Sequence, residues 1–291
     1  MHDALPDVSI LIMPARVSTT LPRCVAQALA QSGGVVEVIV IDDDTDDEHW
    51  QATRVLAQAD ARVRVIPSGT HAGSALNRAI GLARGTWVAL VDPGDRQAPM
   101  RLRRMRALAQ AKGADVVLGN QAVVDVMGLP LLGGPWAGGD QPESWTLVHY
   151  LRGCQGSHPV SALRPLLRRQ FLLDHHIRAI STLHSDAWFH LMVDCYVAGA
   201  SVWFSPRTDC QVTGTDPARP DPDDLRTLIA ATAALADRVD PAARALLGKR
   251  LRRLANLHAA ETSRRALARG RIGVAVSALA RHPGALRHLI R

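Results

Sequence analysis

The stretch that decides the fold of this chain is Ala83-Arg84-Gly85-Thr86-Trp87-Val88-Ala89-Leu90-Val91-Asp92-Pro93-Gly94-Asp95. Its centre is an apolar strand, and two acidic residues three positions apart follow directly. A strand that is apolar on both faces is typical of a buried, parallel sheet. The carboxyl ends of such strands open into the crevice where α/β proteins bind ligands. We therefore expect Asp92 and Asp95 to lie at a ligand site.

A second apolar strand, residues 35–41, is also followed by a run of acids that includes Asp42 and Asp43. Carboxylates are hard oxygen ligands for Mg or Mn, and they also accept hydrogen bonds from ribose or base donors. Two strands that bring acids to one rim thus predict a nucleotide-and-metal site. The alternative is that such acids cap the following helix and interact with its dipole. That alternative is favoured for Asp46 and Asp47, but not for the acids directly after the strands.

The composition is that of an ordinary globular protein, with 291 residues of which 47% are hydrophobic. It fits one large domain, or one domain with an appendage. No apolar run approaches the roughly 18 residues needed to span a bilayer, and the amino end lacks an export signature. We therefore expect a cytoplasmic protein. The four cysteines are widely scattered, which predicts buried thiols and makes a zinc site improbable.

The net charge of +7 is unevenly distributed. Residues 244–291 hold twelve Lys or Arg and the single acid Glu261, whereas residues 1–243 hold 22 basic and 26 acidic residues, a net charge of −4. A basic chain raises nucleic acid as a partner. Here the body is mildly acidic, and three Phe and two Tyr offer little for base stacking. Nucleic acid is therefore not expected as a partner.

The order of predicted elements indicates an α/β protein in its first half. Strands at 8–13, 35–41, 63–66 and 86–91 alternate with helices at 20–29, 46–59 and 73–83. Such alternation predicts a mostly parallel sheet with helices on both faces.

The second half breaks this alternation. We expect a helix from Pro99, a strand at 115–119, a long Gly- and Pro-rich loop at 127–142, an extended segment at 160–167, helices at 169–175 and 185–198, and a last strand at 201–204. The polar, Pro-rich segment 209–224 predicts a linker, and only helices follow it.

Six segments in order resemble the family 2 glycosyltransferases of the GT-A fold. They are Val8 to Pro14, Val38 to Asp43, Ala75-Leu76-Asn77, Ala83-Arg84-Gly85, Leu90 to Asp95, and Arg168-Arg169 with Asp186. The resemblance covers residues 7–210. It implies a GT-A-like mixed sheet flanked by helices. With the predicted linker, the domains are a glycosyltransferase domain at 1–210, a linker at 211–224 and a basic helical C-terminal region at 225–291.

The resemblance also implies roles for individual residues in nucleotide binding. Pro14 and Ala15 would lie in the turn under the nucleotide. Asp42 and Asp43 would lie at the base, with Asp43 as the acceptor of a base hydrogen bond. Asn77 would complete the nucleotide-binding set.

A further implication concerns the metal and the catalytic base. Asp92 and Asp95 would lie at the diphosphate and at a divalent metal, Mn or Mg, although Gly94 stands in the place of the motif's central acid. Asp186 would be the general base that deprotonates the acceptor hydroxyl. From the residues alone, Asp186 can also be the dipole partner of its helix, with Ser185 as the cap. Both roles are compatible.

By this resemblance the chain is an inverting glycosyltransferase. It would move a sugar from a nucleotide-diphosphate donor, with a UDP-sugar as the first choice, to a glycan or lipid-linked acceptor in surface polysaccharide synthesis. The alternative is a catalytically silent sugar-nucleotide-binding or scaffold protein of the same fold. Gly94, and Ser185 in the place of the family's Glu, favour that alternative.

The basic tail has two interpretations. Leucines recur at helical spacing with Lys and Arg between them, at positions 246, 247, 251, 254 and 257. Such a helix can lie on an anionic membrane surface, which would make the protein peripheral on the inner face of the membrane. Alternatively, the leucines pack on the catalytic body and the basic residues face solvent.

Overall fold

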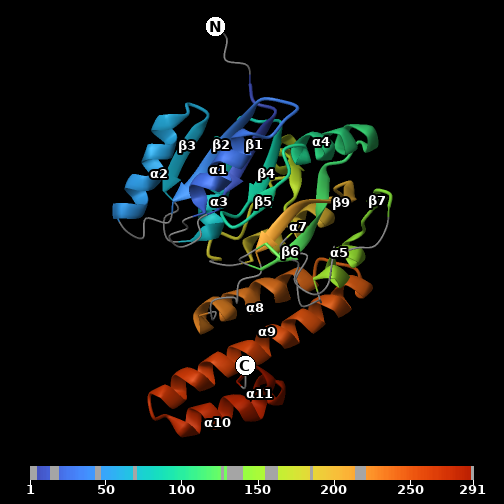
Figure 1. The fold of residues 1–291 in the computed structure, drawn as a ribbon. Coiled ribbons are helices and arrows are strands. Elements are labelled where there is room, and N and C mark those ends of the chain that lie inside the picture. Colours follow the sequence, from blue (N-terminus) through green and yellow to red (C-terminus); the bar gives the residue numbers. More distant parts are fainter. Residues whose placement is uncertain are drawn as a thin grey trace.

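The structure is a computed structural model that describes residues 5–13, 20–42, 47–67, 71–125, 128–129, 140–154, 163–183, 186–213 and 221–289. Its centre is a nine-stranded mixed sheet with helices on both faces (Figure 1). The first half alternates strand and helix as predicted, with all boundaries close to the expected ones. The elements are β1 (Val8–Ile12), α1 (Leu21–Leu29), β2 (Val36–Asp42), α2 (Asp47–Ala59), β3 (Val63–Pro67), α3 (Ala72–Leu82) and β4 (Trp87–Val91).

The second half contains shorter and more irregular elements. They are β5 (Arg96–Gln97), α4 (Arg101–Lys112), β6 (Val116–Val124), β7 (Glu143–Ser144), α5 (Leu147–Gly153), β8 (Leu166–Arg168), α6 (Arg169–Asp174), α7 (Ala187–Val197) and β9 (Val202–Thr213). Four helices and a short 3₁₀ turn follow: α8 (Pro222–Ala236), α9 (Pro241–Ala268), α10 (Ile272–Arg281), the turn Pro283–Ala285 and α11 (Leu286–Leu289).

The strand order places a topological switch point between β1 and β4. The order is β3-β2-β1-β4-β8-β6-β9-β5, with β7 paired to β9. β1 is parallel to both β2 and β4, while β8 runs antiparallel between β4 and β6. The chain therefore turns in opposite directions from β1 to reach its two neighbours. In open α/β sheets, ligands bind at such a switch point.

Each strand contributes side chains to both faces, as the period of two requires. Ile10 and Ile12 of β1 pack in a core with residues of α1 and α4, and Leu11 packs in a second core with α3 and α7. The central strands are fully buried. The predicted helix at 185–198 is confirmed as α7, with Leu191, Met192 and Cys195 buried.

The predicted linker at 209–224 is wrong in its first part, because β9 extends to Thr213. Cys210 pairs with Gln97 of β5 on one side and with Gln121 of β6 on the other. Pairing at both edges holds a strand together where its own sequence is polar. Elements of two residues, such as β5 and β7, carry too little sequence pattern to be predicted.

The C-terminal helices begin as part of the main body. Leu247 and Leu254 of α9 are buried in the same core as Leu11 of β1 and Phe189 of α7. This confirms that these two leucines pack on the sheet domain. α10 and α11 lie further out, away from the sheet (Figure 1), and a small core of Ala259, Ala260 and Ala285 joins them to α9. None of the helices in the described ranges is long and apolar enough to cross a membrane. All four cysteines are buried, as predicted.

The Ala83-Arg84-Gly85 motif lies at the amino ends of the strands, opposite the crevice. Glu37 accepts hydrogen bonds there from the Ser9 hydroxyl at 2.6 Å and from the Arg84 backbone amide at 2.6 Å. The Gly85 amide donates in turn to Ser9 Oγ at 2.8 Å. A Cβ atom at Gly85 would lie 2.5 Å from the Ser9 backbone nitrogen, so only glycine fits this contact.

Gly85→Ala should therefore destabilise the fold, by about 1–3 kcal/mol for an overpacked contact against backbone. Gly81→Ala is the matched control, because Gly81 lies on helix α3 with no atom within 4 Å of its would-be Cβ. The control should stabilise by about 0.4–1 kcal/mol through the unfolded state. Urea unfolding of both variants measures the difference, and equal stabilities would contradict the steric argument.

Candidate functional site

The acidic turn after β4 is a closed structure. The Asp95 amide donates to the Asp92 carbonyl oxygen at 2.9 Å, and the Asp92 amide donates to Asp95 Oδ2 at 2.9 Å. Asp95 is 1% exposed, whereas the Asp92 side chain is 51% exposed. The turn thus has a buried acid that organises it and a second acid that faces the crevice.

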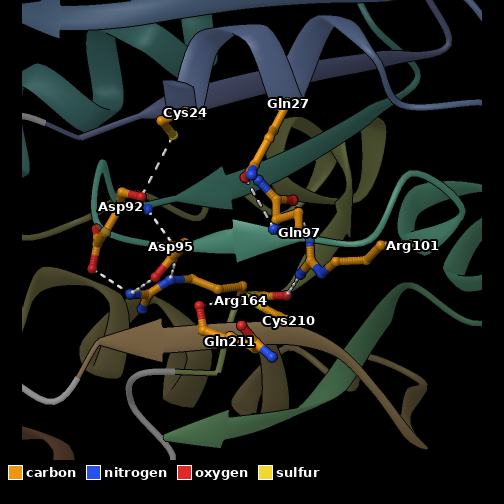
Figure 2. A network of polar contacts seen from close by, with 9 residues as sticks. All are labelled: Cys24, Gln27, Asp92, Asp95, Gln97, Arg101, Arg164, Cys210 and Gln211. Carbon is orange, nitrogen blue, oxygen red and sulfur yellow. Dashed lines mark hydrogen bonds and ion pairs between the residues drawn. The ribbon is translucent and has the colours of Figure 1, made fainter. Parts of the chain in front are cut away.

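Arg164 joins the two acids. β8 pairs antiparallel with β4 so that Ala89 faces Leu166, and this register brings Arg164 beside the end of β4. Its Nε donates to Asp95 Oδ2 at 2.5 Å, and its Nη2 donates to Asp95 Oδ1 at 3.0 Å and to Asp92 Oδ2 (Figure 2). Burial acts to lower the pKa of Arg164, but the carboxylates of Asp92 and Asp95 outweigh it and hold that pKa above its usual value.

A surrounding network fixes this cluster from three other elements. Arg101 of α4 is buried, and its guanidinium donates to the Arg164 carbonyl oxygen and, at 3.0 Å, to Gln97 Oε1 (Figure 2). Cys24 of α1 donates its thiol to the Asp92 carbonyl oxygen at 3.5 Å. Burial, together with the negative charges of Asp95 and Asp92, raises the pKa of Cys24 to about 12. Its sulfur therefore stays a neutral donor.

The arrangement of the acidic turn does not fit a bound divalent metal. Gly94 offers no carboxylate, and both oxygens of Asp95 accept hydrogen bonds from Arg164. Over the described part of the chain, no group of three or more His, Cys, Asp or Glu could hold a metal ion. The Mn or Mg site at Asp92 and Asp95 therefore stays a prediction that this geometry does not support.

Two of the predicted nucleotide-binding residues are described by the structure. Asp42 is fully buried at the end of β2, in register with Pro67 of β3. Asn77 donates to the Ala179 carbonyl oxygen at 2.7 Å and accepts from the Ala179 amide at 2.8 Å. These bonds tie α3 to a later segment, so the observed role of Asn77 is structural and its nucleotide contact stays a prediction. Pro14, Ala15 and Asp43 lie outside the described residues.

The segment that leads to Asp186 is docked on the amino end of α3. The Gly73 amide donates to the Leu183 carbonyl oxygen at 3.0 Å, and a Cβ at Gly73 would lie 2.0 Å from the Ile180 carbonyl oxygen. α3 follows β3, so its amino end lies at the carboxyl edge of the sheet. Asp186 therefore reaches the same edge as Asp92. It directly precedes α7 with φ of 55°, a left-handed conformation that non-glycine residues rarely adopt.

Arg250 of α9 holds the candidate base. Its Nη2 donates to Asp186 Oδ2 at 2.6 Å, and its guanidinium lies 3.8 Å from the centre of the Phe189 ring. Beside it, His190 Nδ1 lies 3.2 Å from the Asp186 carbonyl oxygen. Burial lowers the pKa of His190 to about 4, so this imidazole is neutral at neutral pH. Arg250 could not be recognised as a site residue from the sequence, because it stands among the basic residues between the leucines of the tail.

Sequence comparisons place this chain among glycosyltransferases. Residues 10–145 match the model of glycosyl transferase family 2. The succinoglycan biosynthesis protein ExoO of Rhizobium meliloti is 32% identical over 204 residues, which are 68% of this chain and 58% of ExoO. The succinoglycan biosynthesis protein ExoU of the same organism is 28% identical over 67% of this chain and 58% of its own length. The chain thus spans less than two thirds of these relatives.

Solved structures show the same fold. TarS of S. aureus in complex with UDP-GlcNAc aligns with a TM-score of 0.66 and 17% identity, over 96% of this chain and 81% of that chain. A mannosyltransferase of Pyrobaculum calidifontis in complex with GDP-Man and Mn²⁺ aligns with a TM-score of 0.56 and 14% identity, over 97% and 76%. At these identities the likeness establishes the GT-A fold.

The Arg250–Asp186 pair should contribute measurably to stability, because Arg250 is only 9% exposed and is held on an aromatic ring. A double-mutant cycle with Arg250→Gln and Asp186→Asn should give a coupling of about 1.5–3 kcal/mol in urea unfolding, the range for hydrogen bonds to charged groups. The more exposed pair Arg238–Asp194, at 2.7 Å, is the control and should couple by less than about 1 kcal/mol. Equal couplings would mean that Arg250 does not hold Asp186.

Proposed function

This chain belongs to glycosyl transferase family 2, and from that premise we propose that it moves a sugar, with inversion, from a nucleotide-diphosphate donor to a hydroxyl group of a glycan or lipid-linked acceptor. The observation that supports this proposal is that the segment leading to Asp186 docks on the amino end of α3, at the edge of the sheet where β4 ends before Asp92. The names of ExoO and ExoU, both succinoglycan biosynthesis proteins, support a role in exopolysaccharide synthesis.

The donor side of the proposal rests on the switch point beside β1. A nucleotide there would contact Pro14 and Ala15, with Asp42 at the end of β2 and the next residue in the sequence, Asp43, beside its base. A UDP-sugar remains the first choice. The complexes of TarS with UDP and UDP-GlcNAc support a nucleotide sugar, and that of the mannosyltransferase with GDP-Man supports the same class with another base.

The proposed reaction needs a base on the acceptor side. The acceptor oxygen attacks the anomeric carbon from the face opposite the diphosphate, its proton passes to an oxygen of the Asp186 carboxylate, and the nucleoside diphosphate leaves with the bonding electrons. A positioned base contributes typically 10²–10⁴-fold. Arg250 touches neither substrate in this scheme and acts as a positioning residue, because its bond to Oδ2 fixes the plane of the carboxylate.

The divalent metal that the family resemblance implies has no step in this scheme. When bound, such an ion would neutralise charge on the leaving diphosphate. The acids at the turn are Asp92 and Asp95, and Arg164 already donates to both carboxylate oxygens of Asp95 and to Oδ2 of Asp92. The charge on the leaving group therefore has to be met by this chain's own residues.

A silent sugar-nucleotide-binding protein is the second candidate function. The observation that favours it is the closed ion cluster at the acidic turn, which replaces the family's metal motif. A silent protein and an enzyme share the donor crevice, so they differ only in the need for Asp186 as a base.

Asp186→Asn should separate these two functions. The change keeps the shape of the side chain but removes its ability to take a proton, so sugar transfer should fall by roughly 10²-fold or more. Binding of UDP, measured by calorimetry, should be unchanged. Asp194→Asn on the same helix is the control and should transfer normally. A variant Asp186→Asn with full activity would move the base elsewhere, and a wild-type protein that binds donor but transfers to no acceptor would support the silent protein.

We propose further that α10 contacts an anionic membrane surface where lipid-linked acceptors reside. Ile272 and Val276 lie one helical turn apart and are 66% and 59% exposed. Exposed arginines surround them at positions 269, 271, 281 and 287. Exposed apolar side chains flanked by basic ones are the pattern of interfacial helices.

The double variant Ile272→Ser and Val276→Ser should therefore lose affinity for vesicles that contain phosphatidylserine, by roughly tenfold for two apolar side chains that no longer insert. Co-sedimentation measures the binding. Val55→Ser is the control, since Val55 is 61% exposed on α2, a helix whose sequence holds one basic residue, Arg54. Equal binding by wild type to phosphatidylcholine vesicles with and without phosphatidylserine would contradict the electrostatic part of the proposal.

A further inference from the structure

We propose that Arg164 is the built-in cation of the donor site: its guanidinium occupies the place between Asp92 and Asp95 that a divalent metal would need, and it meets the donor's diphosphate itself. This inference rests on the proposed function and specifies how the leaving group is stabilised. It predicts a donor site that works without Mn²⁺ or Mg²⁺.

Arg164 and a metal ion cannot use the acidic turn at the same time. Asp95 Oδ2 accepts hydrogen bonds from Arg164 Nε and from the Asp92 amide, and Oδ1 accepts from Arg164 Nη2. Asp92 Oδ2 accepts from the same Nη2. The N–H groups lie along the directions in which these oxygens would bind a metal. A divalent ion would therefore have to displace the guanidinium against mutual repulsion.

Displacement is costly because both partners are buried. The Arg164 side chain is 11% exposed and Asp95 is 1% exposed. Removal of one partner from a buried pair leaves an uncompensated charge, which is strongly destabilising. The backbone of Arg164 is also fixed, because the buried Arg101 donates to its carbonyl oxygen and β8 pairs with β4 directly after it.

The chemistry of a guanidinium suits a diphosphate. Its planar donors match two phosphate oxygens, and its charge is permanent at all relevant pH values. The Asp92 side chain is half-exposed, so the cluster is accessible from the side of Asp92. The buried Arg101 donates to the Arg164 carbonyl oxygen and brings a second positive charge to the cluster, so two arginines stand beside the two acids.

The first test measures metal binding without any substrate. Mn²⁺ is titrated into the full chain and free Mn²⁺ is read by electron paramagnetic resonance. Wild type should bind no Mn²⁺ at the turn, whereas Arg164→Gln, which frees the two carboxylates, should bind Mn²⁺ at least roughly tenfold more tightly. Arg104→Gln is the matched control, because Arg104 pairs with Asp209 on the surface at 2.5 Å.

The second test measures binding of a diphosphate group, with inorganic pyrophosphate as the probe and EDTA present. Pyrophosphate carries no nucleotide base, so the identity of the donor's base does not matter. Wild type and Arg104→Gln should bind pyrophosphate by calorimetry, and Arg164→Gln should bind it at least about tenfold more weakly. Arg164→Lys keeps the charge but not the planar donors. It should still exclude Mn²⁺ and lose part of the pyrophosphate affinity, and it serves where Arg164→Gln does not fold.

Two results would overturn the inference: tight binding of Mn²⁺ by wild type, or pyrophosphate binding by wild type that requires a divalent ion. Neither measurement needs a donor sugar, an acceptor or turnover. Failure of the proposed function would appear instead as absent transfer by a protein whose Mn²⁺ exclusion and pyrophosphate binding follow the pattern above. The two failures are therefore distinguishable.

Discussion

The parallel pairing of β1 with β2 on one side and β4 on the other is the constraint on which the rest of the structure depends. Because all three strands are buried on both faces, their polar residues can lie only at the strand ends. The amino ends are closed by the network of Ser9 and Glu37, which leaves no room for a side chain at Gly85. The acids lie at the carboxyl ends of the strands, so the candidate site is confined to that edge of the sheet.

The fold of the first half could be predicted because each of its elements is determined by residues close together in the sequence. Each strand is a short apolar run and each helix has its own periodicity, so the α/β architecture and the place of Asp92 directly after a strand follow from neighbouring residues. The GT-A fold was predicted from the resemblance to a family. The second half depends on pairing between distant segments. β9 continues through polar residues because β5 and β6 flank it, and its own sequence does not show this. The boundaries of the three predicted domains stay a prediction, although α8 and the first part of α9 share the main core.

The candidate site was predictable in its acids but not in its cations. Asp92, Asp95 and Asp186 stand next to recognisable elements. Arg164 is 72 residues from Asp92 and Arg250 is 64 residues from Asp186, and neither lies in a motif. Arg164 reaches the turn only because β8 inserts antiparallel beside β4, and such an insertion has no signature in the strand itself. A resemblance to a family identifies the candidate acids. Their counter-ions are determined by how this particular chain packs.

The arginines of the tail divide it into two parts with different tasks. Near the body, Arg250 pairs with Asp186 and ties α9 to the sheet domain. Further along α9, Arg265 pairs with Asp221 at the start of α8, which joins two helices of the tail. The exposed arginines around α10 have a different setting, beside apolar side chains that face solvent. The excess positive charge of the sequence is therefore not spread over a uniform basic helix. Part of this charge supplies a counter-ion for the candidate site, and part lies on the exposed face of the distal helices. A change in one part need not disturb the other.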